Sequence, residues 1–125
     1  MSGGARILVV DDERSMREFL EILLRKEGYD VTTAGDVDGA LLALESDDFD
    51  LVISDIQMPG KTGLDLLKAI REANADALVV MITAFATTET AISAMKEGAY
   101  DYLTKPFKLD EIKLVVQKAL EKKSL

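Results

Sequence analysis

Short apolar runs alternate with amphipathic stretches along the whole chain. The runs are rich in Val, Ile and Leu, and most of them end abruptly in a polar or charged residue. Nearly continuous apolar runs of this length are typical of strands that are buried on both faces of a parallel sheet. The pattern therefore predicts five strands, at residues 7–10, 31–34, 51–54, 78–82 and 100–104.

Between the strands, apolar residues recur every three or four positions, which is the period of an amphipathic helix. Gly28 and Gly98 lie where the first and fourth helices should end, and Asp110 is the expected N-cap of the last helix. We expect every apolar stripe to pack in the core. The stripes are Met16, Phe19, Leu20, Leu23 and Leu24; Ala40, Leu41 and Leu44; Leu64, Leu67 and Ile70; Ala91, Ile92 and Met95; and Ile112, Val115, Val116, Ala119 and Leu120.

Five strands, each followed by a helix, predict a doubly wound α/β fold. The best expectation is a flavodoxin-like (βα)5 domain with a five-stranded parallel sheet in the order 2-1-3-4-5. The 125 residues fit one domain, residues 1–125, with mobile ends at 1–5 and 122–125. In such folds the functional crevice lies at the carboxyl ends of the strands, where the strand order reverses.

Composition narrows the chemistry available to that crevice. The chain has no Cys and no His, which excludes disulfides, thiol chemistry, imidazole bases and His-ligated zinc. No apolar run approaches the roughly 20 residues that span a bilayer, and the first residues lack the apolar segment of a secretory signal. We therefore expect a cytoplasmic protein.

The charge of −8 is unevenly distributed along the chain. Residues 1–75 carry 8 Lys and Arg against 16 Asp and Glu, whereas residues 76–125 carry 7 of each sign. An acidic excess in the first part of the domain argues against direct binding to nucleic acid or to an anionic membrane.

Polar side chains follow four of the five predicted strands. Asp11 and Asp12 come after the first strand, Asp55 after the third, Thr83 after the fourth and Lys105 after the fifth. Because parallel strands end at the same edge of a sheet, we expect these side chains to share one pocket. Each alone is ordinary, since acids cap helices, Asp favours turns and Lys-Pro is typical of a loop. Together they indicate a site.

Three carboxylates in one pocket repel one another, and a divalent cation relieves the repulsion. Oxygen ligands without His or Cys favour Mg²⁺, with Mn²⁺ as a substitute. Because Mg²⁺ at such sites commonly contacts a substrate phosphate, the pocket suggests phosphoryl transfer. Asp55, at the end of the central strand, is the best candidate nucleophile, and Lys105 and Thr83 could contact phosphoryl oxygens.

Over residues 6–120 the chain resembles the receiver domains of bacterial two-component response regulators. This resemblance implies that Asp55 accepts a phosphoryl group from a sensor histidine kinase. It also implies that Asp12, Asp55 and the main-chain carbonyl of Gln57 ligate Mg²⁺, with Asp11 contacting the ion through water. The motifs that carry the resemblance are Ile7-Leu8-Val9-Val10-Asp11-Asp12-Glu13, Asp55-Ile56-Gln57-Met58-Pro59-Gly60 with Gly63, Thr83-Ala84 and Lys105-Pro106-Phe107.

The same resemblance implies a conformational switch. The Thr83 hydroxyl would reorient toward the phosphoryl group and Tyr102 would then turn inward, changing an output face made of the fourth helix, fifth strand and fifth helix. Gln57 and Phe85 occupy positions thought to tune phosphoryl lifetime. Residues 94–107 most resemble the sigma-54-activator, or nitrogen-regulatory, type, in which ATPase and DNA-binding modules follow the receiver and control transcription.

The resemblance implies a signalling receiver that supports its own phosphorylation and autodephosphorylation, not a turnover enzyme, and three alternatives remain open. A Mg²⁺-dependent phosphatase would need a second acid where Gln57 stands, and room for a substrate cap. A structural module would keep the fold without being phosphorylated. Nucleotide binding is the third alternative, but the sequence contains no phosphate-binding glycine motif. The apolar stripe of the last helix also allows a homodimer.

Overall fold

Five parallel strands form one sheet in the order β2-β1-β3-β4-β5, as the sequence predicts. The computed structural model describes residues 4–73, 75–84 and 88–124. β3 is central, so its last residue lies in the middle of the sheet edge at which all the strands end. The strands are β1 (Arg6–Val10), β2 (Asp30–Ala34), β3 (Leu51–Asp55), β4 (Leu78–Thr83) and β5 (Asp101–Thr104).

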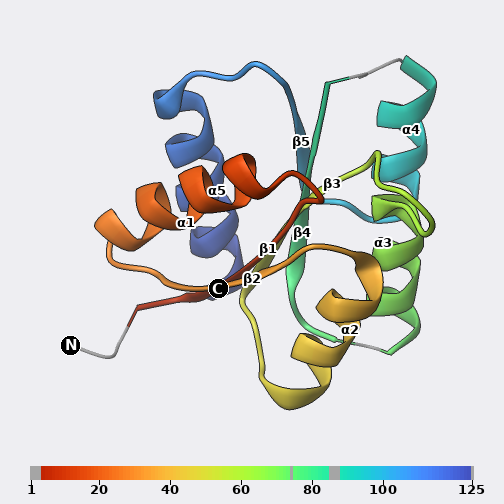
Figure 1. Cartoon of the computed structure of the whole chain (residues 1–125), viewed down its shortest axis with the longest axis horizontal. Coiled ribbons are helices and arrows are strands. Elements are labelled where there is room, and N and C mark those ends of the chain that lie inside the picture. The colour runs from red at the N-terminus through yellow and green to blue at the C-terminus, as the bar shows by residue number, and fades with distance from the viewer. Residues whose placement is uncertain (1–3, 74, 85–87, 125) are drawn as a thin grey trace.

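Helices cover both faces of the sheet, as Figure 1 shows. α1 (Arg14–Lys26) and α5 (Leu109–Ser124) lie on one face, and α2 (Val37–Ser46), α3 (Gly63–Glu72) and α4 (Thr88–Lys96) lie on the other. Side chains alternate between the faces of a strand. Ile7 and Val9 accordingly belong to the core with α1 and α5, whereas Leu8 and Val10 pack into the core with α2 and α3.

The helix ends are partly as predicted. Gly28 and Gly98 follow α1 and α4 with φ angles of +92° and +100°, a backbone conformation that glycine adopts without a steric penalty. The prediction that Asp110 caps the last helix is wrong, because α5 begins at Leu109. Asp110 lies in the first turn, and the Glu111 carboxylate instead accepts a hydrogen bond of 2.7 Å from the main-chain N–H of Lys108.

The expectation that every apolar stripe is buried is also wrong for part of the chain. On α4, Ile92 and Met95 are 48% and 45% exposed, and Phe19 on α1 is 41% exposed. α4 packs against the edge strand β5 and against α3, and among its described side chains Ala94 is the one that belongs to the core. The apolar period marks a helix here but does not tell how much of its apolar face is covered.

The structure describes the two ends of the chain only in part, so their expected mobility stays a prediction. Residues 1–3 and 125 lie outside the described residues. The Ala5 carbonyl accepts a hydrogen bond of 2.9 Å from the N–H of Asp30, and residues 122–124 form the last turn of α5. Within the described ranges, no helix is both long enough and apolar enough to cross a membrane.

Candidate functional site

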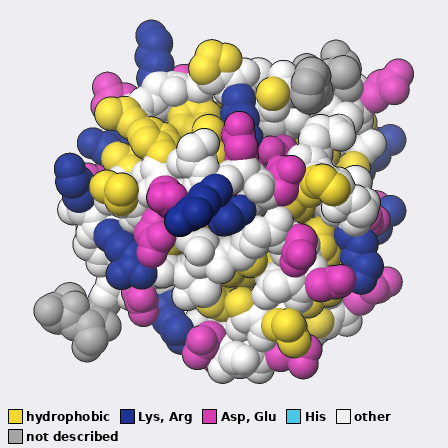
Figure 2. Space-filling model, in the orientation of Figure 1, with side chains coloured by type: hydrophobic (Ala, Val, Ile, Leu, Met, Phe, Trp, Pro, Cys, Tyr) yellow, Lys and Arg dark blue, Asp and Glu magenta, His cyan; other side chains and the backbone are white. Residues whose placement is uncertain are grey.

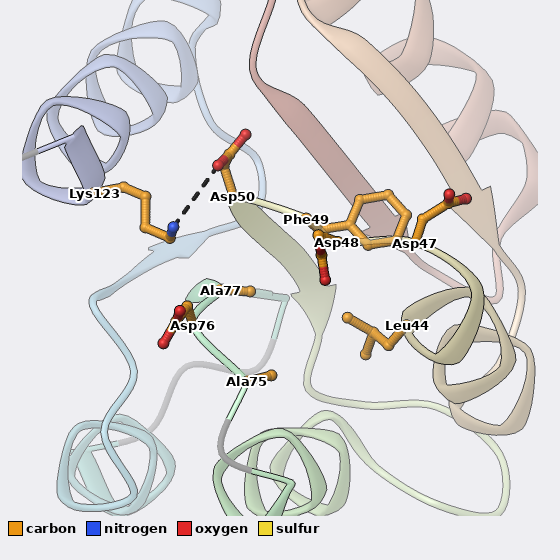
Figure 3. Close-up of a pocket in the computed structure, with 9 residues that line it drawn as sticks. All are labelled: Leu44, Asp47, Asp48, Phe49, Asp50, Ala75, Asp76, Ala77 and Lys123. Carbon is orange, nitrogen blue, oxygen red and sulfur yellow. Dashed lines mark ion pairs between the residues drawn. The ribbon is translucent and has the colours of Figure 1, made fainter.

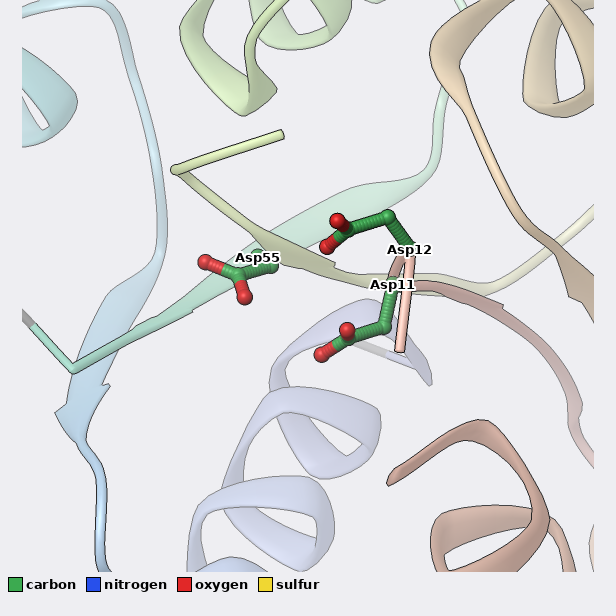
Figure 4. A group of neighbouring side chains, drawn as sticks. All are labelled: Asp11, Asp12 and Asp55. Carbon is green, nitrogen blue, oxygen red and sulfur yellow. The ribbon is translucent and has the colours of Figure 1, made fainter. Parts of the chain in front are cut away.

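Three carboxylates converge at the edge where β1 and β3 end (Figure 4). Asp11 and Asp12 directly follow β1, and Asp55 is the last residue of β3, the strand that pairs with β1. One oxygen from each carboxylate lies within 4.8 Å of the others. Asp11 and Asp55 are 2% and 7% exposed, and Asp12 faces solvent. The structure thus brings together the three acids that the strand pattern singled out.

Lys105 joins the two buried carboxylates. Its Nζ atom lies 3.0 Å from Oδ2 of Asp11 and 2.8 Å from Oδ2 of Asp55, and its side chain is 14% exposed. The backbone places it there, because the Lys105 N–H donates to the Thr83 carbonyl at 2.8 Å as the chain leaves β5. Burial by itself would lower the pKa of Lys105, but hydrogen bonds and charge attraction from Asp55 and Asp11 outweigh it and raise the pKa. Lys105 is therefore an ammonium at neutral pH.

The charges at this edge do not balance. Counted formally, the three carboxylates and the ammonium of Lys105 carry a net charge of −2, which one divalent cation would offset. Among the described residues, the acidic side chains grouped here present carboxylate oxygens, which are the ligands that Mg²⁺ prefers. The residues present therefore fit a magnesium ion on grounds of charge and ligand type.

The backbone around Asp55 is held by close packing. The Gln57 N–H donates to Oδ1 of Asp55 at 3.0 Å, and the Ile56 N–H donates to the Ile82 carbonyl at 3.1 Å. Gly63 begins α3 directly against this segment, and a Cβ atom there would collide with the main-chain oxygen of Asp55 and the Cα of Ile56. A capping box between Thr62 and Asp65 starts the helix at that point. Glycine at position 63 thus allows α3 to lie against Asp55.

Asp11 has further contacts, one of them from a residue that the sequence analysis did not single out. Oδ1 of Asp11 accepts a hydrogen bond of 2.9 Å from the Glu13 N–H. Its main-chain carbonyl accepts one of 2.7 Å from Nη1 of Arg17. Arg17 is the fourth residue of α1, and helical side chains lean toward the N-terminus of their helix. That lean was the signal available in the sequence, since it directs an early arginine back toward the preceding loop.

The remaining predicted residues lie on the last two strands. Thr83 ends β4 at the same sheet edge as Asp55 and is 1% exposed. Tyr102 lies in β5, is 37% exposed, and lines a surface groove together with Ile92 and Met95 of α4. Phe85, the second position expected to tune phosphoryl lifetime, lies outside the described residues.

A different hollow lies at the opposite edge of the sheet. This cavity of about 340 Å³ is lined by residues that precede β3 and β4 and by Lys123 of α5 (Figure 3). Lys123 pairs there with Asp50 at 3.8 Å. None of the five strand-end residues Asp11, Asp12, Asp55, Thr83 and Lys105 lines this cavity.

On the face in Figure 2, acidic and basic side chains are interspersed, and apolar side chains gather beside α1 and α5. Phe19, Ile22, Leu109 and Leu114 are the large exposed apolar residues of these two helices.

Comparisons with known proteins point to one family. Residues 7–117 match the family model of the response regulator receiver domain. The chain is 39% identical to the regulatory protein AtoC of Escherichia coli over 125 residues, which is all of this chain but 27% of AtoC. It thus spans about a quarter of that relative's length.

Two solved structures extend the comparison. NtrX from Brucella abortus superposes with a TM-score of 0.91 at 42% identity, covering 97% of this chain and 28% of NtrX. The response regulator TrrA from Thermotoga maritima, in complex with Mg²⁺ and BeF, superposes with a TM-score of 0.84 at 41% identity, covering 93% of this chain and 99% of TrrA. The similarity to AtoC and NtrX is consistent with the nitrogen-regulatory type of response regulator that residues 94–107 resemble. The match over residues 7–117 and the acid cluster at the strand ends lead to one conclusion: the chain belongs to the response regulator receiver domain family.

Proposed function

We propose that Asp55 is the phosphoacceptor of this receiver domain and that the acid cluster holds Mg²⁺ during the reaction. Asp12, Asp55 and the main-chain carbonyl of Gln57 would ligate the ion, and Asp11 would contact it through water. Mn²⁺ accepts the same oxygen ligands and would substitute. The observation that carries the proposal is the grouping of three carboxylates with one lysine, which leaves two negative charges at the end of the central strand.

In the proposed reaction a carboxylate oxygen of Asp55 attacks the phosphorus of a phosphohistidine on the kinase. A new P–O bond forms while the P–N bond breaks, and the electron pair leaves with the histidine. The bound ion would offset negative charge on the phosphoryl group. Lys105, which already contacts Asp55 at 2.8 Å, supplies a second positive charge and a hydrogen-bond donor to a phosphoryl oxygen. The Thr83 hydroxyl donates another.

Autodephosphorylation uses the same groups. A water oxygen attacks the phosphorus, the P–O bond to Asp55 breaks, and inorganic phosphate leaves with the carboxylate restored. No His, Cys or external reductant is required, in keeping with the composition of the chain. Gln57 is exposed and lies two residues after Asp55. Of the two positions expected to influence phosphoryl lifetime, it is the one that lies within the described residues.

The output follows from the charge change at Asp55. Thr83 would move toward the phosphoryl group, Tyr102 would turn inward from its exposed position, and the face made of α4, β5 and α5 would change shape.

The proposed partners are a sensor histidine kinase, a second copy of the chain, and ATPase and DNA-binding modules if the natural protein is longer. Residues 1–125 would act as one receiver domain in the cytoplasm, controlling transcription through those modules and contacting neither nucleic acid nor membrane directly.

The direct test uses acetyl phosphate as a small phosphodonor. With Mg²⁺ present, we expect the intact mass of the protein to increase by one phosphoryl group, and we expect no increase when a chelator removes the metal. Mg²⁺ should also stabilise the fold, by about 2.7 kcal/mol when its concentration is 100 times its Kd, because it binds only the folded site. Undiminished phosphorylation in the chelator would contradict the metal site. Absence of phosphorylation with Mg²⁺ would favour a structural module, and repeated turnover of simple phosphate esters would favour a phosphatase.

A further inference from the structure

Arg17 connects the two loops that follow β1 and β2. Its Nη1 atom donates a hydrogen bond of 2.7 Å to the main-chain carbonyl of Asp11. The same guanidinium lies against Gly35, where an added Cβ atom would be 3.3 Å from Nη1 and 3.6 Å from Cζ. Gly35 directly follows β2, the strand that pairs with β1. Arg17 therefore contacts both loops: it donates a hydrogen bond to the loop after β1, and its guanidinium packs against the loop after β2.

This contact completes the hydrogen bonding of Asp11. The Asp11 N–H donates to the Ala34 carbonyl at 3.2 Å, Oδ1 accepts from the Glu13 N–H, and Oδ2 accepts from Lys105. The main-chain carbonyl is the remaining polar group, and Arg17 donates to it. That carbonyl belongs to the peptide unit that joins Asp11 to Asp12. Arg17 thus fixes the orientation of the peptide plane from which Asp12 continues.

The orientation of this peptide affects the position of the Asp12 carboxylate. Its side chain is exposed, in contrast to the buried side chains of Asp11 and Asp55. An exposed carboxylate receives little support from packing, so its position follows the backbone that carries it. We propose that Arg17 is a positioning residue for cation binding: by fixing the peptide between Asp11 and Asp12, it holds the Asp12 carboxylate in place beside Asp55. The inference rests on the proposed function, because it assigns Asp12 to the magnesium site.

Two physical effects predict opposite results when the arginine is removed. Arg17 is a cation close to a cation site, so its charge alone repels Mg²⁺ and its loss would tighten binding. Its hydrogen bond orders a ligand-bearing loop, so loss of that order would weaken binding. Groups that orient metal ligands from outside the ligand shell typically contribute 10- to 100-fold to affinity. We therefore expect positioning to outweigh repulsion.

The experiment is calorimetric titration of the full chain with Mg²⁺ alone. In Arg17→Gln we expect the Kd for Mg²⁺ to rise by about tenfold. The matched control is Arg14→Gln on the same helix, because Arg14 is 84% exposed and pairs with Glu18 at 3.2 Å. The control should leave the Kd within about twofold of the wild-type value, since its guanidinium forms a surface ion pair instead. Native-state hydrogen exchange without metal gives an independent readout, in which the Glu13 amide should exchange faster in Arg17→Gln than in the control.

A second variant keeps the test decisive if Arg17→Gln folds poorly. Gly35→Ala leaves the arginine and its charge in place, but its Cβ crowds the guanidinium, so it should weaken Mg²⁺ binding in the same direction and by a smaller factor. Binding by Arg17→Gln as tight as, or tighter than, wild type would overturn the positioning role. If the wild-type chain itself binds no Mg²⁺, the proposed function fails; if wild type binds and both variants bind equally well, only the role of Arg17 fails.

Discussion

Replacing Asp55 with asparagine is expected to abolish phosphoryl uptake while preserving the fold. The substitution keeps the shape of the side chain, and its amide oxygen can still accept the Gln57 N–H that now bonds Oδ1 of Asp55. Lys105 retains its ion pair with Asp11 at 3.0 Å. A neutral amide, however, is a poor nucleophile and does not form an acyl phosphate. Intact-mass measurement after incubation with acetyl phosphate and Mg²⁺ should detect no phosphorylated Asp55→Asn protein.

The control for that experiment is Asp76→Asn. Asp76 is an exposed aspartate before β4, at the far edge of the sheet, and the change removes the same charge. It should take up phosphate at the wild-type rate. Wild-type uptake by Asp55→Asn would place the acceptor on another residue, and circular dichroism of both variants would show whether any loss reflects unfolding.

Replacing Lys105 with methionine is expected to lower the free energy of unfolding by about 3 kcal/mol at neutral pH without Mg²⁺. The ammonium bridges two carboxylates that are 2% and 7% exposed, and methionine leaves them close together without a compensating charge. Added Mg²⁺ should recover more stability in the variant than in wild type, because it relieves a larger repulsion. Chemical denaturation with and without Mg²⁺ measures both effects.

The pH dependence of that stabilisation has a definite sign. Interactions with Asp55 and Asp11 outweigh burial and raise the pKa of Lys105 above its ordinary value of 10.5, so folding favours the ammonium. Its stabilising contribution is present in full below about pH 10 and is lost as the pH rises through the raised pKa. Lys105→Met should lack this alkaline loss. Lys123→Met is the matched control, because Lys123 pairs with Asp50 at 3.8 Å at the opposite edge of the sheet. If Lys123→Met lowered the free energy of unfolding as much as Lys105→Met does at neutral pH, the special role of Lys105 would be contradicted.

The sheet and the acid cluster could be predicted because both follow from local patterns. Apolar runs such as residues 51–54 have one environment available in a small α/β domain, a strand covered on both faces. Once the strands are parallel, their carboxyl ends share one edge, so Asp11, Asp12 and Asp55 must come close. The order of the strands is confirmed, whereas the proposed roles of the individual residues remain predictions.

The features that could not be predicted depend on neighbours distant in the sequence. The stripe on α4 has the same period as the buried stripes, but α4 lies against an edge strand, so Ile92 and Met95 remain exposed. Asp110 suits the start of a helix, but α5 begins one residue earlier, at Leu109, and the Glu111 carboxylate accepts the hydrogen bond from Lys108. The lean of Arg17 toward the N-terminus of α1 is the signal available in the sequence, but it does not show which group the guanidinium meets until α1 is placed beside the Asp11 carbonyl.

The most direct test of the central claim is a crystal structure of this chain with Mg²⁺ and beryllofluoride bound. The predicted result is one metal ion in contact with the carboxylates of Asp12 and Asp55 and the main-chain carbonyl of Gln57, with beryllofluoride on an Asp55 oxygen and Lys105 on a fluorine. Beryllofluoride on another residue, or an acid cluster that contains no metal at saturating Mg²⁺, would contradict it.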